Sequence, residues 1–173
     1  MPTAKAPPSI YEFKVTLLDI APPIWRRFRL PSDMRMCCIH SALQVVMGWT
    51  DSHLHLFEKD GINWGVVEWD EFGDLELRDE DRVPIGDVLK AAGESLRYTY
   101  DFGDDWVHEV VLEKILPADT DAKRTVCVAG ERRCPPEDVG GPHGYQEFLE
   151  VIFTPGHEEF EHYPPMGGES RPR

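Results

Sequence analysis

Four segments of the sequence alternate apolar and polar residues with a period of two, and this pattern constrains the fold more than any other feature. They are Tyr11–Leu18, Ile24–Leu30, Leu96–Phe102 and Trp106–Leu116. Such alternation is typical of a strand with one buried and one solvated face. Prolines break the chain between the first two segments, and the turn residues Gly103-Asp104-Asp105 join the last two. The pattern therefore predicts two antiparallel pairs in one sheet.

Helical spacing predicts a few helices that cover this sheet. The clearest stripe, which Gly48 ends, is formed by Met36, Ile39, Leu43, Val46 and Met47. Pro31-Ser32-Asp33 offers oxygens that could cap its start. Pro84 predicts the start of a second helix over Ile85–Ala92, and a third resumes at Tyr145.

Shorter segments add to the predicted sheet. Ser52–Phe57 alternates and is expected to pair with Ile62–Val67 across a turn at Asp60-Gly61. Val126–Glu131 is expected to be an edge strand. We expect the acidic stretch Glu68–Asp81 to be a solvated loop and the proline- and glycine-rich stretch Cys134–Pro142 to lack regular structure.

The fold class that follows is α+β, a single domain with a mainly antiparallel mixed sheet packed against two to three helices. A chain of 173 residues with 41% hydrophobic residues is long enough for one core and contains no internal repeat. The expected organisation is a disordered leader over residues 1–9, the domain over residues 10–160 and a flexible tail over residues 161–173.

The net charge and the cysteines limit the possible partners and the cellular compartment of the protein. A formal charge of -14 disfavours general binding to nucleic acid, although arginines cluster at Arg26, Arg27 and Arg29 and could form a small anion site or a solvated strand edge. No signal peptide or membrane-spanning segment is recognisable, and the cysteine spacing predicts reduced thiols. We therefore expect a cytoplasmic protein without a membrane partner.

Four motifs occur together in one order along the chain. They are Trp25-Arg26-Arg27, then Gly48-Trp49 with His53-Leu54-His55-Leu56-Phe57, then Tyr98-Thr99-Tyr100-Asp101-Phe102-Gly103-Asp104-Asp105-Trp106-Val107-His108, and finally Cys134-Pro135-Pro136-Glu137-Asp138 with Gly140-Gly141 and Gly144-Tyr145. From about Tyr11 to about Glu159 the chain resembles the plasmid Ri ORF-three-like family, also labelled TnpR-like passenger proteins of an insertion element.

The resemblance implies a compact α+β fold of unknown function, with a link to transposon resolution by label alone. Similar proteins continue beyond His157-Glu158-Glu159 with a tryptophan-containing segment. This chain instead ends in a stretch with Pro164-Pro165-Met166-Gly167-Gly168. We therefore carry over no expectation about the role of that segment from the resemblance.

The candidate metal ligands are His53, His55, His108 and Cys134. His53 and His55 lie two positions apart on an expected strand, so both side chains would leave the same face. Zinc accepts such a mixed set of nitrogen and sulfur donors, although the spacing matches no standard zinc motif. The alternative is that the two histidines form a hydrogen-bonded, partly exposed strand face.

The candidate binding residues are Asp101, Asp104, Trp106, Glu137, Asp138 and Tyr145. The aspartates around the hairpin could serve a ligand or cap the turn, and the acids of the later loop could accept hydrogen bonds from loop amides. The aromatic residues of the hairpin are expected mostly in the core, with Phe102 among them. Trp64 and Trp69 are the candidates for an exposed patch. Cys134 as a nucleophile is disfavoured, because the following Pro135 lacks the amide that an oxyanion hole uses.

These observations leave three hypotheses for function. The first is a non-enzymatic binding or accessory domain that holds an ion or recognises an unknown protein or small ligand through its loops. The second is a metal-assisted hydrolase using His53, His55 and His108 near Asp104 or Glu137. The third, taken from the family label alone, is a role in DNA recombination.

Overall fold

A computed structural model describes residues 7–67, 76–118 and 125–158. Its strands and helices follow in the order β1 (Ile10–Leu17), β2 (Ile24–Pro31), α1 (Met36–Met47), β3 (His55–Lys59), β4 (Ile62–Gly65), β5 (Leu77–Asp79), the short 3-10 helix η2 (Glu80–Arg82), α2 (Ile85–Val88), β6 (Ser95–Tyr100), β7 (Trp106–Leu116), β8 (Val126–Glu131) and α3 (Gly141–Phe153). Residues 1–6 of the expected leader and the expected tail lie outside the described residues.

The eight strands form one sheet in the order β5-β4-β3-β6-β7-β1-β2-β8. All neighbours are antiparallel except β4 and β5, which run parallel. The two predicted antiparallel pairs are confirmed as β1 with β2 and β6 with β7. The two pairs are joined because β1 also pairs with β7 along its whole length. The sheet is mixed and the domain is single, as the sequence predicts.

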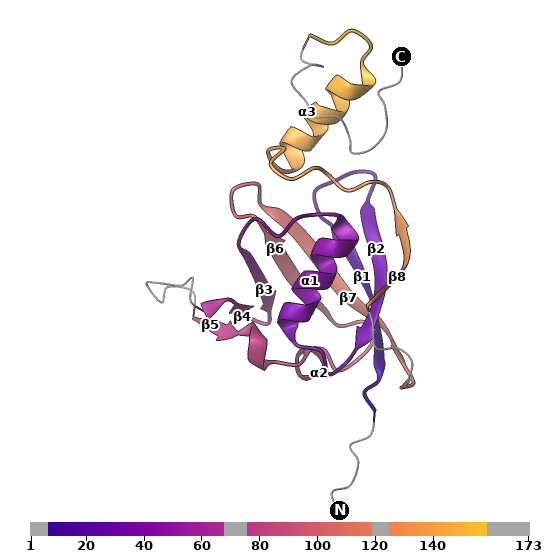
Figure 1. Cartoon of the computed structure of the whole chain (residues 1–173), viewed down its shortest axis with the longest axis vertical. Helices are drawn as coiled ribbons and strands as arrows, with labels where there is room; N and C mark the ends of the chain where they lie inside the picture. The colour runs from indigo at the N-terminus through magenta and orange to yellow at the C-terminus, as the bar shows by residue number, and fades with distance from the viewer. Residues whose placement is uncertain (1–6, 68–75, 119–124, 159–173) are drawn as a thin grey trace, which may run out of the picture.

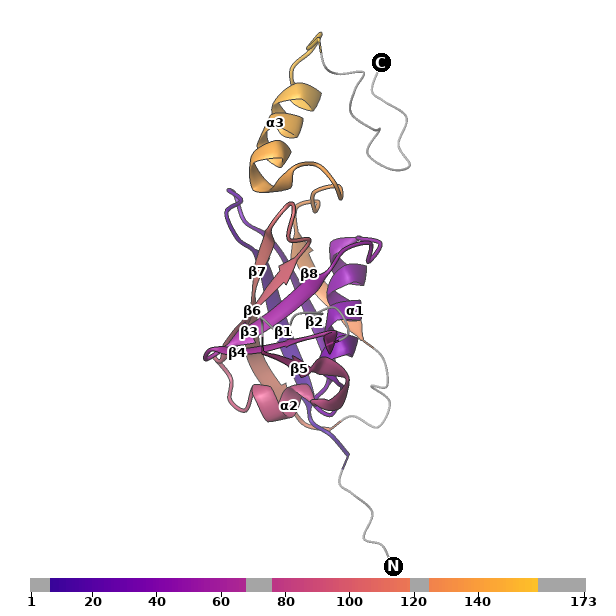
Figure 2. The ribbon, with the colours of Figure 1, turned by 90° about the vertical axis from the view of Figure 1, so that its left-hand side faces the viewer.

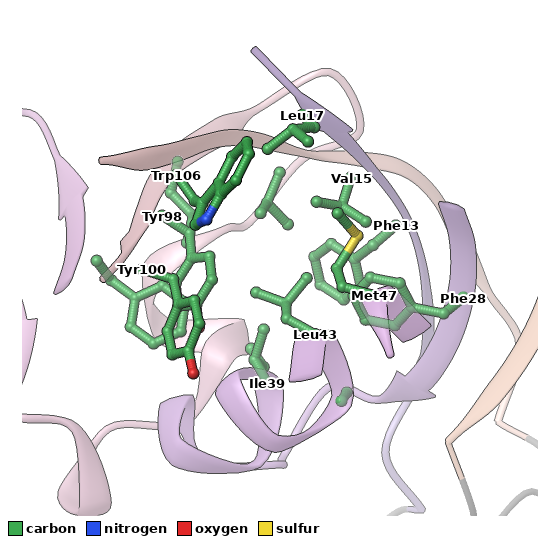
Figure 3. Close-up of a cluster of buried hydrophobic side chains, with 14 of the residues drawn as sticks. Phe13, Val15, Leu17, Phe28, Ile39, Leu43, Met47, Tyr98, Tyr100 and Trp106 are labelled. Atoms are coloured by element: carbon green, nitrogen blue, oxygen red, sulfur yellow. The ribbon is translucent and has the colours of Figure 1, made fainter. Parts of the chain in front are cut away.

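Helix α1 lies across one face of this sheet (Figures 1 and 2). Its buried stripe contains Ile39, Leu43 and Met47, which Figure 3 shows facing Phe13 and Tyr98 on the strands. Burying each such side chain contributes roughly 1.5–3 kcal/mol, so this stripe holds the helix on the sheet. Gly48 ends α1 in the left-handed conformation at φ 81°, and its amide donates to the carbonyl of Gln44.

The clustered arginines of β2 are all engaged by ion pairs or hydrogen bonds. Arg27 Nε lies 2.5 Å from Glu113, and Arg29 lies 2.5 Å from the buried carboxylate of Glu12. The guanidinium of Arg26 donates to the carbonyl oxygens of Trp25, Val46 and Glu131 and to the sulfur of Cys134. These arginines therefore tie strands, α1 and a loop together.

Helix α3 lies beyond the end of the strands, next to the turn between β6 and β7 (Figure 1). The sequence-based expectation that regular structure resumes only at Tyr145 is wrong, because α3 begins at Gly141. Pro142 occupies the first turn of this helix. A proline fits there because its missing amide would have no intrahelical partner.

Other boundaries also differ from the expectation. Helix α2 is shorter than predicted, since Leu89 is already extended and fully buried. The expected loop before it contains β5 and η2, although residues 68–75 of that loop are not described. Trp64 is buried rather than exposed, and Trp69 lies outside the described residues. Phe102 is 50% exposed because the left-handed Asp101 ends the alternation of β6.

Within the described ranges, no helix is long and apolar enough to cross a membrane.

Candidate functional site

Three loops meet at the end of the sheet near α3. The first joins α1 to β3 (residues 48–54), the second joins β6 to β7 (residues 101–105), and the third joins β8 to α3 (residues 132–140). We call the polar side chains that these loops bring together the loop cluster; they are Thr50, His53, Asp101, Asp104, Glu137 and Asp138. Four of the six are acidic.

Glu137 fixes the third loop to the sheet. One oxygen of its carboxylate accepts a 2.6 Å hydrogen bond from the hydroxyl of Tyr100. The other accepts from both the amide of Thr50, at 2.9 Å, and its hydroxyl, at 2.6 Å. Burial, and then the hydrogen bond to Glu137, raises the pKa of Tyr100 above its ordinary value, so the phenol remains a donor. Glu137 is therefore a structural anchor.

Asp104 holds the start of α3 against the β6–β7 turn. Its carboxylate accepts a 3.1 Å hydrogen bond from the amide of Gly140. Gly141 follows at φ 67°, and a Cβ at this position would overlap the carbonyl oxygen of Asp104. A second contact comes from Trp49, whose indole donates to the carbonyl of Pro135 at 3.0 Å. The third loop is thus attached along its length.

Asp101 shapes the turn and keeps one carboxylate oxygen for the cluster. The residue is left-handed at φ 57°, a conformation that aspartate tolerates better than most residues. Its Oδ1 accepts hydrogen bonds from the amides of Gly103, at 3.0 Å, and Asp104, at 3.3 Å. Its Oδ2 lies 3.5 Å from Nε2 of His53. Asp101 is only 8% exposed, so this oxygen is held close to the imidazole.

His53 lies between two carboxylates from the other two loops. Its Nε2 is 3.0 Å from Oδ1 of Asp138 and 3.5 Å from Oδ2 of Asp101. Neither oxygen forms a hydrogen bond with this buried nitrogen. One donor atom from each residue lies within 4.8 Å of the others, a spacing that could hold a metal ion. His53, Asp101 and Asp138 are therefore the part of the loop cluster with metal-ligating atoms close together.

The four predicted metal ligands do not share one site in the described residues. His55 starts β3 and is buried, with Nε2 2.8 Å from the carboxylate of Glu80. His108 is fully buried, and its pKa is lowered to about 4 by burial. Cys134 packs against Arg26, and burial raises the pKa of its thiol to about 11. His53 precedes β3, so the expected common strand face of the two histidines does not arise.

His55 belongs to a separate buried polar group that the sequence did not reveal. Its ring stacks on that of His40 with centroids 3.6 Å apart and planes 6° apart. Gln44 accepts from the amide of Asp51, so its NH2 group donates to the hydroxyl of Tyr98. The phenol then donates to Nδ1 of His40, and the Nε2 proton of His40 points to Asp51 at 2.7 Å. Burial, and then His55, lowers the pKa of His40, in agreement with this neutral tautomer.

The predicted binding residues divide between the loop cluster and the core. Asp101, Asp104, Glu137 and Asp138 belong to the loop cluster. Trp106 is fully buried and Tyr145 is 4% exposed, and the hydroxyl of Tyr145 donates to the carbonyl of Arg133 at 3.4 Å. Thr50 was missed, because a single threonine after a helix carries no motif. Its proximity to Glu137 becomes visible only once the loops are placed.

The fold and site define a class of protein: a small α+β domain with an eight-stranded sheet and an acidic loop cluster at one end. The chain belongs to the family of the plasmid pRiA4b ORF-3-like protein, whose model matches residues 9–170. This match confirms the resemblance carried by the four motifs.

Two relatives extend this assignment. The uncharacterized protein y4hQ from Sinorhizobium fredii is 39% identical over 151 residues, which cover 87% of this chain and 76% of that protein. The crystal structure of MM3350 from Methanosarcina mazei Go1, described as a protein of unknown function, matches with a TM-score of 0.79 and 37% identity. That match covers 90% of this chain and 87% of MM3350. The names of these two relatives state no activity.

Proposed function

We propose that the protein is a cytoplasmic accessory domain that binds a cationic group at the loop cluster, and that it is not an enzyme. The single observation behind this proposal is the convergence of Asp101 and Asp138 on one imidazole. Among the described residues, neither carboxylate forms an ion pair with a lysine or arginine. A cluster with uncompensated negative charge attracts cations, and rigid loops around it favour recognition.

The rigidity of the loops also supports a binding role. Glu137 and Asp104 are both engaged in hydrogen bonds between loops, so the cluster is assembled before any ligand arrives. A preformed site binds without the entropic cost of ordering its own loops. The cytoplasmic placement is supported by four cysteines that are all free thiols.

The alternative of a metal-assisted hydrolase, in its original form, needs His53, His55 and His108 around one ion. His55 contacts Glu80 and His108 lies in the core, so this ligand set is not assembled. A role in binding DNA receives no support from the arginines of β2. Arg27 and Arg29 are paired with Glu113 and Glu12 on the strands.

The proposal is tested by titrating isotope-labelled protein with magnesium, calcium, zinc and spermidine while recording amide spectra. We expect the amides of Gly103, Asp104 and Gly140 to shift, since they donate to Asp101 and Asp104. The double variant with Asp101→Asn and Asp138→Asn should lose these shifts. Shifts that are absent for every cation, or that lie only elsewhere in the protein, would contradict the proposal.

A further inference from the structure

We infer that His53, Asp101 and Asp138 form a binding site for one divalent transition-metal ion of the zinc class. This inference rests on the proposed function, because it names the cation that the loop cluster takes. The ligand atoms would be Nε2 of His53, Oδ2 of Asp101 and Oδ1 of Asp138, each supplied by a different loop.

The spacing of these atoms fits a common ion. With bonds of about 2.0–2.1 Å, two ligands of a tetrahedral zinc ion lie roughly 3.3 Å apart. The observed separations from Nε2 are 3.0 Å to the oxygen of Asp138 and 3.5 Å to that of Asp101. Both carboxylate oxygens therefore lie close to the separation from the imidazole that coordination requires, and all three donor atoms lie within 4.8 Å of one another.

The orientation of His53 distinguishes this group from an ordinary ion pair. Its Nε2 is buried within the cluster and has no hydrogen-bond partner among the described residues, despite two nearby carboxylates. Such an atom costs free energy unless something satisfies it. A metal ion would bind to the lone pair of Nε2, and the two carboxylate oxygens would bind the same ion.

The donors are also held independently of an ion. Asp101 is 8% exposed, and its other oxygen is engaged by the amides of Gly103 and Asp104. The ring of His53 packs edge-on against Tyr100, with centroids 5.8 Å apart. Asp138 is left-handed at φ 58° and follows Glu137, whose carboxylate is hydrogen-bonded to Thr50 of the first loop and Tyr100 of β6. Little rearrangement is needed to bring the three ligands onto one ion.

The donor set selects the class of ion. Calcium and magnesium prefer oxygen ligands alone, whereas zinc and its neighbours accept imidazole nitrogen together with carboxylate oxygen. Three protein ligands leave at least one position for water or for a group of a partner. Asp138 has a side chain that is 73% exposed, so this position would face the solvent side of the site.

The experiment is a calorimetric titration of tag-free protein with zinc chloride, paired with visible absorption spectra of the protein loaded with cobalt. We expect one ion per chain. Separate His53→Gln and Asp138→Asn variants should each weaken zinc binding by at least about tenfold and alter the cobalt spectrum.

Matched controls apply the same chemical changes at exposed positions outside the ligand set. These are His143→Gln on α3 and Asp105→Asn in the β6–β7 turn, and both should bind zinc as the parent protein does. Amide spectra of every variant check that the fold is kept. An Asp101→Asn variant, which can keep the turn bonds through its remaining oxygen, covers the case in which a His53 variant fails to fold.

The outcomes separate this inference from the proposed function. If zinc binds equally to the parent and to the His53→Gln variant, the inference is overturned. If calcium, magnesium or spermidine shifts the loop-cluster amides but zinc does not bind, the zinc site is refuted while the cationic function stands. If no cation binds, both are refuted.

Discussion

The hydroxyl of Tyr100 donates a 2.6 Å hydrogen bond to the carboxylate of Glu137, which joins the last residue of β6 to the loop before α3. The same carboxylate accepts two hydrogen bonds from Thr50. Three donors from two separate segments therefore converge on one side chain. This convergence explains how a loop rich in proline and glycine is held in one conformation beside the candidate site.

The first prediction concerns this anchor. The change Glu137→Gln replaces one acceptor oxygen by an NH2 group that faces a donor, so the free energy of unfolding should fall by about 1.5–3 kcal/mol. Denaturant unfolding at neutral pH measures the change. Glu147→Gln, at a side chain 60% exposed on α3, is the matched control and should change stability by less than about 0.5 kcal/mol. Equal stability of both variants would show that Glu137 is not an anchor.

The second prediction concerns Gly141 at the start of α3. Gly141→Ala should destabilise the protein more than Gly156→Ala does, although both glycines have positive φ. A left-handed alanine costs roughly 1–2 kcal/mol at either position. At Gly141 the new Cβ also overlaps the carbonyl of Asp104, whereas at Gly156 it meets nothing within 4 Å. Thermal unfolding of both variants measures the difference, and an equal loss would argue against the close approach of α3 to the turn.

The third prediction concerns pH. Burial lowers the pKa of His108 to about 4, while the unfolded chain has an ordinary value of about 6.5. Below pH 6.5 the unfolded chain therefore binds a proton at His108 while the folded protein does not. Above pH 6.5 the imidazole is neutral in both states, and the stability that comes from burying neutral His108 is fully present. It is lost as pH falls toward 4, and the total loss is on the order of 3 kcal/mol.

The measurement is the free energy of unfolding of the parent protein and of a His108→Leu variant across this range. The carboxylates of Glu12 and Glu113, whose pKa values are lowered by their ion-pair partners, also lose stabilising energy in acid in both proteins. The difference between the two curves isolates His108. A difference that does not vary with pH would mean that His108 is not buried in its neutral form.

The fourth prediction tests how α1 is held on the sheet. Leu43→Ala removes a side chain with 0% exposure and should cost about 2–5 kcal/mol. Val45→Ala on the same helix, where the side chain is 78% exposed, is the control and should change little. Denaturant midpoints compare the two. A similar effect at both positions would contradict the assigned buried face.

Sequence reasoning succeeded where local chemistry decides the structure. The alternation in β1, β2, β6 and β7 and the stripe on α1 are properties of neighbouring residues, so they could be predicted. The pairing of β1 with β7 could not, because nothing in either segment states which distant strand lies beside it. The sequence does not reveal the start of α3, because glycine and proline usually break regular structure but are both accepted in the first turn of a helix.

The candidate site was also predictable only in part. Its residue types were recognisable, but their grouping was not, since it depends on loops that bend at left-handed aspartates. Asp51, Asp101 and Asp138 all have φ near 60°, in the range 57° to 60°. Each lies in one of the three loops that meet at the site, and Asp101 also ends the alternation of β6. For this reason His53 meets two carboxylates and His55, two residues later, meets Glu80.

The position of β1 in the sheet has a consequence for biosynthesis. Strand β1 pairs on one side with β2, which follows it at once in the chain, and on the other with β7, which lies much further along the chain and is therefore made later. Until β7 emerges, one edge of β1 has no hydrogen-bonding neighbour and can attract the wrong one. During synthesis this edge of β1 is therefore exposed to wrong pairing, and deletion of β1 would remove the strand that joins β7 to β2 in the sheet.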